Sequence, residues 1–134
     1  MSGERNLGTL LKDMKPEMQD GVFVFCALPE DQITAAISPL LMFREREGTT
    51  LVIRREDAER GGLPYQCASR LITLTVHSSL EAVGFLAAIT ARLAEAGISV
   101  NAVSAFHHDH LFVPDGRADE ALKLLQDMSR PRSG

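Results

Sequence analysis

The fold is decided by residues 71–106, which read LITLTVHSSLEAVGFLAAITARLAEAGISVNAVSAF. From Leu71 to His77, apolar and polar residues alternate, as in a strand with one buried face. From Glu81 to Ala96, apolar residues recur at helical spacing, and Gly97 follows as a signal for the end of a helix. Alternation returns from Ile98 to Phe106. The stretch therefore predicts a strand, a helix and a second strand, joined by a right-handed crossover that lets the two strands run parallel.

The residues that follow extend this pattern. His107 to Asp109 predicts a tight turn, His110 to Val113 a returning strand, and Asp119 to Met128 a final helix with Leu122 and Leu125 facing inward. Strand, helix, strand, strand and helix make up most of a ferredoxin-like unit, whose fourth strand is missing from this half. We therefore expect an α+β fold.

The first half predicts shorter elements. Leu7, Leu10, Leu11 and Met14 form one apolar stripe of a helix that Pro16 ends. The segments that follow are a strand, a short helix, the two strands of a hairpin and one or two helical turns: Val22–Cys26, Gln32–Ile37, Leu41–Arg46, Thr49–Arg54 and Glu56–Arg60. One of these three strands could complete the sheet of the second half. We expect two halves of one architecture, residues 1–66 and 67–134, which share an antiparallel sheet.

Composition excludes several classes of function. The chain has 134 residues, enough for one domain or two small halves, and 45% of them are hydrophobic. Its formal net charge of −4 argues against sequence-independent nucleic-acid binding, which needs a basic face. The longest apolar runs, such as Ile37 to Phe43, are far shorter than the roughly 20 residues of a membrane span. The N-terminus has no apolar signal region, so we expect a cytoplasmic protein whose two cysteines are reduced.

Four stretches carry a resemblance to a known family. They are Glu47-Gly48-Thr49-Thr50-Leu51-Val52, Ser78-Ser79-Leu80-Glu81-Ala82-Val83-Gly84, Ala96-Gly97-Ile98-Ser99-Val100-Asn101, and His108-Asp109-His110-Leu111-Phe112-Val113-Pro114. In this order and spacing the chain resembles the ACT domain, the small-molecule-binding regulatory module of amino-acid metabolism. It resembles most a group of small, uncharacterised bacterial ACT proteins, and more distantly the tandem ACT halves of the CASTOR-type arginine sensors. The chain departs from that group at one position. Members of the group often have an aromatic residue, commonly Tyr, immediately before the His-Asp-His motif, where this chain has His107.

The first candidate site is the junction between the strand and the helix. A helix N-terminus presents unpaired N–H groups and partial positive charge, which favour a carboxylate. The resemblance implies that ACT domains bind amino acids at this junction, with an asparagine from the next strand, here Asn101. The structural alternative is that Ser79 only caps the helix and Gly84 only packs. The expected ligand-binding residues of this site are Ser79, Leu80, Glu81, Ala82, Val83, Gly84 and Asn101.

The second candidate site is the motif around Asp109. His108, Asp109 and His110 have side chains of metal-ligand types, but neighbouring residues of a strand face opposite sides, so only the alternate pair His108 and His110 could share a face. A metal site, a structural turn and the edge of a ligand pocket all remain open. We include these three residues among the expected ligand-binding residues and assign no metal ligand or cofactor.

Neither cysteine is in a catalytic context. Cys26 lies in an apolar run, and Cys67 lies in a connector without a recognisable Cys-His-Asn arrangement. The sequence also contains no phosphate-binding or serine-nucleophile motif. We therefore assign no catalytic residue and expect the chain not to be an enzyme.

The sequence supports one leading function and two alternatives. The leading hypothesis is a regulatory or sensor module that binds a small molecule, an amino acid by resemblance, and acts through a partner or as a homodimer, without nucleic acid or membrane. The first alternative is an ACT-like structural oligomer that binds no ligand. The second is a metal-binding protein that uses the His-Asp-His turn.

Overall fold

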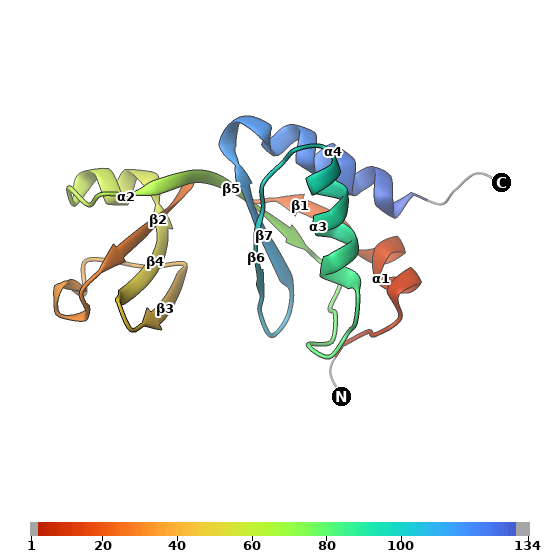
Figure 1. The fold of residues 1–134 in the computed structure, drawn as a ribbon, viewed down its shortest axis with the longest axis horizontal. Helices are drawn as coiled ribbons and strands as arrows, with labels where there is room; N and C mark the ends of the chain where they lie inside the picture. The colour runs from red at the N-terminus through yellow and green to blue at the C-terminus, as the bar shows by residue number, and fades with distance from the viewer. Residues whose placement is uncertain (1–2, 131–134) are drawn as a thin grey trace. The chain divides into compact units, whose positions relative to one another are not determined.

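The computed structural model describes residues 3–130, which form two compact units (Figure 1). One unit combines the start of the chain, up to Asp20, with the chain from Arg70 onward, and the other consists of Gly21–Ser69. Strand β5 (Gln66–Leu74) takes part in both units, because its first residues belong to one and its last residues to the other. The expected boundary between residues 66 and 67 stays a prediction, and residues 1–2 and 131–134 of the two expected halves lie outside the described range.

The unit of residues 21–69 is a four-stranded antiparallel sheet with little helix. Its strands are hydrogen-bonded in the order β3-β4-β2-β5. The predicted hairpin is confirmed, and its turn lies immediately before Gly48. In chain order the elements are β2 (Phe23–Leu28), the 3-10 helix η1 (Glu30–Gln32), β3 (Leu41–Glu45), β4 (Gly48–Arg54) and α2 (Arg55–Arg60).

The helix predicted over Gln32–Ile37 is wrong. The structure has only η1, which ends at Gln32 because Ile33 is extended, with φ −82° and ψ 119°. The hydroxyl of Thr34 accepts a hydrogen bond from the backbone N–H of Ala36 at 3.3 Å. Such local side-chain bonds compete with the helical backbone, and a β-branched isoleucine adds little helix propensity.

The other unit contains the long helices. Its strands are ordered β1-β5-β7-β6, and α1, α3 and α4 contact one another (Figure 1). The helix predicted near the N-terminus is confirmed as α1, which Asn6 caps by accepting from the N–H of Thr9. The elements are α1 (Leu7–Asp13), β1 (Pro16–Met18), β5, α3 (Phe85–Glu95), β6 (Asn101–Ser104), β7 (Asp109–Pro114), the 3-10 helix η2 (Asp115–Arg117) and α4 (Ala118–Ser129).

The fourth strand of this unit is β1, which the sequence analysis did not predict. Pro16 opposes Leu74 and Met18 opposes Ile72 in an antiparallel pairing. Proline suits a first strand residue, since it has no N–H to donate to the ladder. The strand predicted over Val22–Cys26 was one of three candidates for this position. It forms β2 instead, which pairs with β5 only through Gln66 and Ser69, in the other unit.

The two units have the same strand order. The match is found when one unit is counted from β2 and the other from β5, with β1 counted last although it comes first in the chain. The second strand then lies at one edge, followed by the third, the first and the fourth. Strand β5 is the fourth strand of one unit and the first of the next, so the predicted α+β, ferredoxin-like halves with a shared antiparallel sheet are confirmed. They differ in the first connection, which is η1 in one unit and the eleven-residue α3 in the other.

Each unit has its own apolar core. The core of residues 21–69 is small, and its buried members are Val24, Cys26, Leu28, Leu51, Ile53 and Ala58. The core of the other unit is larger because α1, α3 and α4 contribute to it. Its buried members are Leu10, Met14, Ile72, Leu74, Phe85, Ile89, Leu93, Ile98, Leu111, Val113, Ala118, Ala121 and Leu125. Within residues 3–130, no helix combines the length and apolar character that a membrane span requires.

Candidate functional site

The segment between β5 and α3 is held in place by the start of the chain. The backbone N–H of Glu4 donates to the carbonyl of His77 at 2.9 Å, and the N–H of Ser79 donates to the carbonyl of Glu4 at 2.8 Å. Gly3 lies so close to Ser78 and Ser79 that a Cβ there would lie 2.6 Å from the Ser79 nitrogen. Residues 3–4 therefore fix the backbone that forms one wall of the candidate site.

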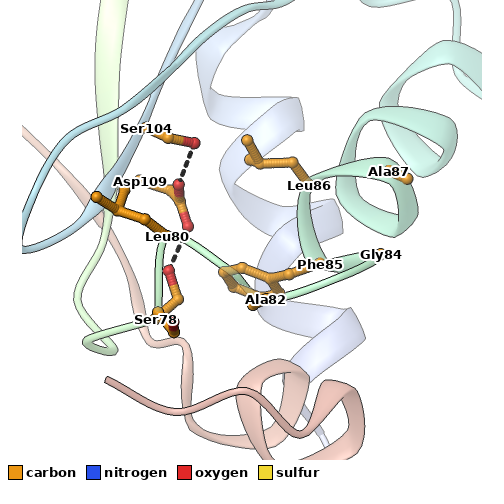
Figure 2. Close-up of a pocket in the computed structure, with 10 residues that line it drawn as sticks. Ser78, Leu80, Ala82, Gly84, Phe85, Leu86, Ala87, Ser104 and Asp109 are labelled. Atoms are coloured by element: carbon orange, nitrogen blue, oxygen red, sulfur yellow. Dashed lines mark hydrogen bonds between the residues drawn. The ribbon is translucent and has the colours of Figure 1, made fainter. Parts of the chain in front are cut away.

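A buried carboxylate lies beside this segment. Asp109, the first residue of β7, is 5% exposed. Its two carboxylate oxygens accept one hydrogen bond each, at 2.7 Å, from the hydroxyls of Ser78 and Ser104 (Figure 2). The three side chains come from the segment after β5, from β6 and from β7, so their hydrogen bonds join three parts of one unit.

Helix α3 begins later than the sequence predicts. It starts at Phe85 rather than Glu81, and its N-cap is Gly84, whose φ of 89° favours glycine. Ser79 does not cap the helix, because its hydroxyl accepts from the N–H of Glu81 at 3.1 Å in the preceding turn. Counted from the start of the helix, the first backbone N–H group that has an acceptor is that of Ala88. It donates to the carbonyl of Gly84 at 2.9 Å. Among residues 3–130, the N–H groups of residues 85–87 therefore have no backbone acceptor, as is usual for the first turn of a helix.

The three residues that carry these donors line one cavity together with Asp109. Its volume is about 120 Å³, and Figure 2 shows Phe85, Leu86 and Ala87 on one side and Asp109 with its two serines on the other. A helix N-terminus carries partial positive charge, whereas Asp109 supplies a carboxylate. The full lining is Ser78, Ser79, Leu80, Ala82, Gly84, Phe85, Leu86, Ala87, Ser104 and Asp109.

The structure brings half of the predicted ligand-binding residues together. Those that line the cavity are Ser79, Leu80, Ala82, Gly84 and Asp109, and those that do not are Glu81, Val83, Asn101, His108 and His110. The side chain of Glu81 instead lies 4.0 Å from Arg5 on the surface, and Val83 is 83% exposed. Asn101 is an exposed residue at the start of β6, opposite Phe112.

The sequence analysis missed Phe85, Leu86, Ala87 and Ser104 as site residues, and it placed Ser78 in the candidate junction without naming it as a ligand-binding residue. Gly84 could have indicated the three helical residues, since glycine is common beside a helix end and the residues after it would then form the first turn. No local pattern points to the two serines, because Ser78 is 31 positions from Asp109.

The histidines that flank Asp109 form a separate cluster. The ring centroids of His108 and His110 lie 6.4 Å apart, and the Nδ1 atom of His110 lies 3.0 Å from the hydroxyl of Thr73. Burial, and to a smaller extent the nearby His108, lowers the pKa of His110 below its ordinary value, while Asp109 opposes this shift. Within residues 3–130, no group of three or more His, Cys, Asp or Glu side chains is placed to hold a metal ion.

The two cysteines are not bonded to each other and differ in environment. Cys26 is buried in the core of residues 21–69, and this burial raises the pKa of its thiol. Cys67 is exposed. A raised pKa lowers the fraction of reactive thiolate, so Cys26 is suited to packing rather than to nucleophilic chemistry.

Two family models match the chain, and both describe an ACT domain. They match residues 2–70 and 66–127. Among solved structures, a protein of unknown function from Vibrio cholerae is 41% identical, with a TM-score of 0.83, over 92% of this chain and 96% of that one. No curated protein is significantly similar in sequence.

Two more distant structures share the fold. A protein from Agrobacterium tumefaciens is 16% identical, with a TM-score of 0.73, and the match covers 85% of this chain and 87% of that one. The regulatory subunit of aspartate kinase from Thermus flavus is 9% identical, with a TM-score of 0.63, and the match covers 87% of this chain and 97% of that one.

Proposed function

This chain belongs to the ACT domain family, and we propose that it is a non-catalytic regulatory or sensor module that binds a small amino acid in the cavity beside α3. The observation that carries this proposal is the pairing of Asp109 with the N-terminus of α3 across one cavity. An amino acid has an ammonium group and a carboxylate on the same carbon. The cavity offers a partner of suitable charge for each.

The ligand carboxylate would accept from the N–H groups of Phe85, Leu86 and Ala87. These donors have no acceptor within the helix, and the helix end favours negative charge. The ligand ammonium would donate to Asp109. A carboxylate has about four acceptor positions, of which the two serine hydroxyls occupy two. The serines thus orient the carboxylate and leave room for a cation.

The size of the cavity limits the ligand. Its volume is about 120 Å³. Typical pockets for larger ligands measure about 300–1,000 Å³. We therefore expect the amino and carboxyl groups, with a short side chain, to fit inside, and a longer side chain to extend out of the mouth.

Regulation would act through another protein or through assembly. The Thermus flavus structure similar in fold is a regulatory subunit of an aspartate kinase, which supports a role as a separate regulatory chain. We propose a homodimer in the cytoplasm as the working form, with no nucleic acid, membrane or cofactor involved.

A thermal-shift panel of the twenty amino acids tests the proposal. A ligand at 100 times its Kd stabilises the folded protein by about 2.7 kcal/mol, so a binding amino acid raises the midpoint measurably. We expect one or a few small amino acids to respond, and Asp109→Asn to weaken their binding at least tenfold. Asn keeps the size of the side chain but removes the charge that the ammonium needs.

The matched control is Asp13→Asn, which removes an exposed carboxylate of α1 outside the cavity and should leave the response unchanged. By contrast, Gly84→Val should abolish the response, because a β-branched residue is strained at a φ of 89°. A flat panel with well-folded protein would contradict the proposal and favour the ligand-free scaffold. In that case the bonds of Ser78 and Ser104 to Asp109 serve structure alone.

A further inference from the structure

Strand β3 forms one edge of the sheet in the unit of residues 21–69 (Figure 1). It pairs with β4 over all five of its residues, Leu41–Glu45, and among residues 3–130 no other strand pairs with it. An edge strand presents a row of backbone N–H and C=O groups on its free side. This side of β3 is therefore a template for another strand.

The side chains of this edge are both apolar and exposed. Phe43 is 64% exposed and Met42 is 47% exposed, and Leu40, immediately before the strand, is 51% exposed. Natural edge strands are usually protected by charged residues, prolines or bulges. The charges of β3 lie only at its end, on Arg44 and Glu45, and the strand runs in one continuous register with β4.

The sequence of β3 is complementary to itself. Two copies related by a two-fold axis pair antiparallel, and pairing over the whole strand places that axis at its middle residue, Phe43. Phe43 then faces its counterpart, Met42 faces Arg44 of the second copy, and Leu41 faces Glu45. No like charges meet in this register. Registers centred on Arg44 or Glu45 place like charges directly opposite each other, which is destabilising.

The two charged residues keep partners within their own chain. The guanidinium of Arg44 lies 3.1 Å from the carboxylate of Glu30, and the carboxylate of Glu45 accepts from the hydroxyl of Thr50. Each can therefore face an apolar residue of the second copy without losing its partner. The aliphatic stem of an arginine also packs well on an apolar side chain such as that of Met42.

A second copy suits this edge better than another strand does. In a two-fold pairing each copy covers the free edge of the other, so the assembly closes as a dimer. A pairing of β3 with a different part of a second copy would leave one β3 edge free, which allows further copies to add. The symmetric register also brings the two rings of Phe43 together, and aromatic cross-strand pairs stabilise sheets.

We propose that β3 is the homodimer surface of this chain, and that two copies pair β3 to β3 with the two-fold axis at Phe43. The sheets of residues 21–69 then continue from one copy into the other. This inference rests on the homodimer of the proposed function and is independent of the amino-acid site.

The first test is a disulfide between two copies. Phe43→Cys is made in a Cys67→Ser background, because Cys67 is exposed and Cys26 is buried. Opposite residues of an antiparallel pair have Cα atoms about 4.5–5.5 Å apart, a distance that a disulfide spans. We expect mild oxidation to give a disulfide-linked dimer.

Arg44→Cys in the same background is the register control. In the proposed register, its two copies lie two residues apart along the strands, with Cα atoms about 8 Å apart, too far for a disulfide. It should therefore link at least tenfold more slowly than Phe43→Cys. Equal or faster linking of Arg44→Cys would contradict the register, and no linking of Phe43→Cys would contradict the pairing.

The second test is sedimentation of the whole protein over a series of concentrations. We expect a reversible dimer, whose Kd rises at least tenfold in Phe43→Lys because two like charges then meet at the axis. The matched control is Phe106→Lys, which changes an equally exposed phenylalanine, 63% exposed, in the other unit. Its Kd should stay within twofold of the wild type, and the amide spectrum of each variant checks that it folds.

The outcomes separate this inference from the rest of the account. A wild-type protein that sediments as a monomer at every concentration contradicts the β3 surface and the homodimer together. A dimer with the same Kd in Phe43→Lys contradicts the β3 surface alone. Neither result changes what is expected of amino-acid binding, which the thermal-shift panel measures separately.

Discussion

Asp109 shows how a single residue organises the candidate site. It follows the turn of the β6–β7 hairpin, and strand alternation turns it away from His108 and His110 toward Ser78 and Ser104. The sequence predicted that alternation, since neighbouring strand residues face opposite sides. The sequence could not predict that the two serines contact Asp109, because contacts between distant segments leave no local pattern.

His110 should make stability depend on pH. Its pKa is lowered in the folded protein, chiefly by burial, from an ordinary value of about 6.5. As the pH falls below that value, the unfolded chain binds a proton at His110 before the folded chain does, so the free energy of unfolding decreases. We expect a smaller decrease between pH 7 and 5 in His110→Asn, whose amide can still bond Thr73.

Chemical denaturation at a series of pH values measures this difference. Between pH 8 and 7.5, above the ordinary pKa, the unfolding free energies of wild type and His110→Asn should change in parallel, which serves as the control. Equal slopes for both proteins between pH 7 and 5 would show that His110 does not carry the effect.

Among the elements, the segment between β5 and α3 depends on its neighbours. Its backbone pairs with Glu4 at both ends of Ser78, and its last residue, Gly84, adopts a left-handed conformation. The sequence identified this segment as the candidate site because Ser79 and Gly84 mark a predicted helix start. It placed the helix start four residues early, because Ser79 satisfies the signature of an N-cap while bonding within a turn.

Gly3→Ala tests the contact between the chain start and this segment. The φ of Gly3 is +89°, and an added Cβ would lie 2.6 Å from the Ser79 nitrogen and 2.7 Å from the Ser78 carbonyl carbon. The left-handed conformation alone costs roughly 1–2 kcal/mol for alanine. We expect the free energy of unfolding to fall by about 1–3 kcal/mol, with faster amide exchange at Ser79.

Gly116→Ala is the matched control. A Cβ at Gly116 would meet no atom within 4 Å, so its effect should stay within about 0.5 kcal/mol. If denaturation gives the same small change for both variants, the start of the chain does not hold the site segment.

At the scale of the whole molecule, two units repeat one architecture with shared use of β5. The helix–strand periodicity of residues 71–113 was sufficient to predict the fold class. Strand β1 was not predictable, because three residues are too few to show alternation and Pro16 is equally typical of a helix end. The absence of a helix after η1 was not predictable, because the apolar residues Ile33 and Ile37 also suit a helix.

The most direct test of the central claim is an amide NMR titration of the protein with each small amino acid. The account predicts that at least one of them causes saturable shifts in the backbone amides of Phe85, Leu86 and Ala87, together with that of Asp109. These groups form the two sides of the cavity beside α3. If no amino acid shifts these amides, or if saturable shifts occur only elsewhere in the chain, the assignment of this cavity as an amino-acid site is wrong.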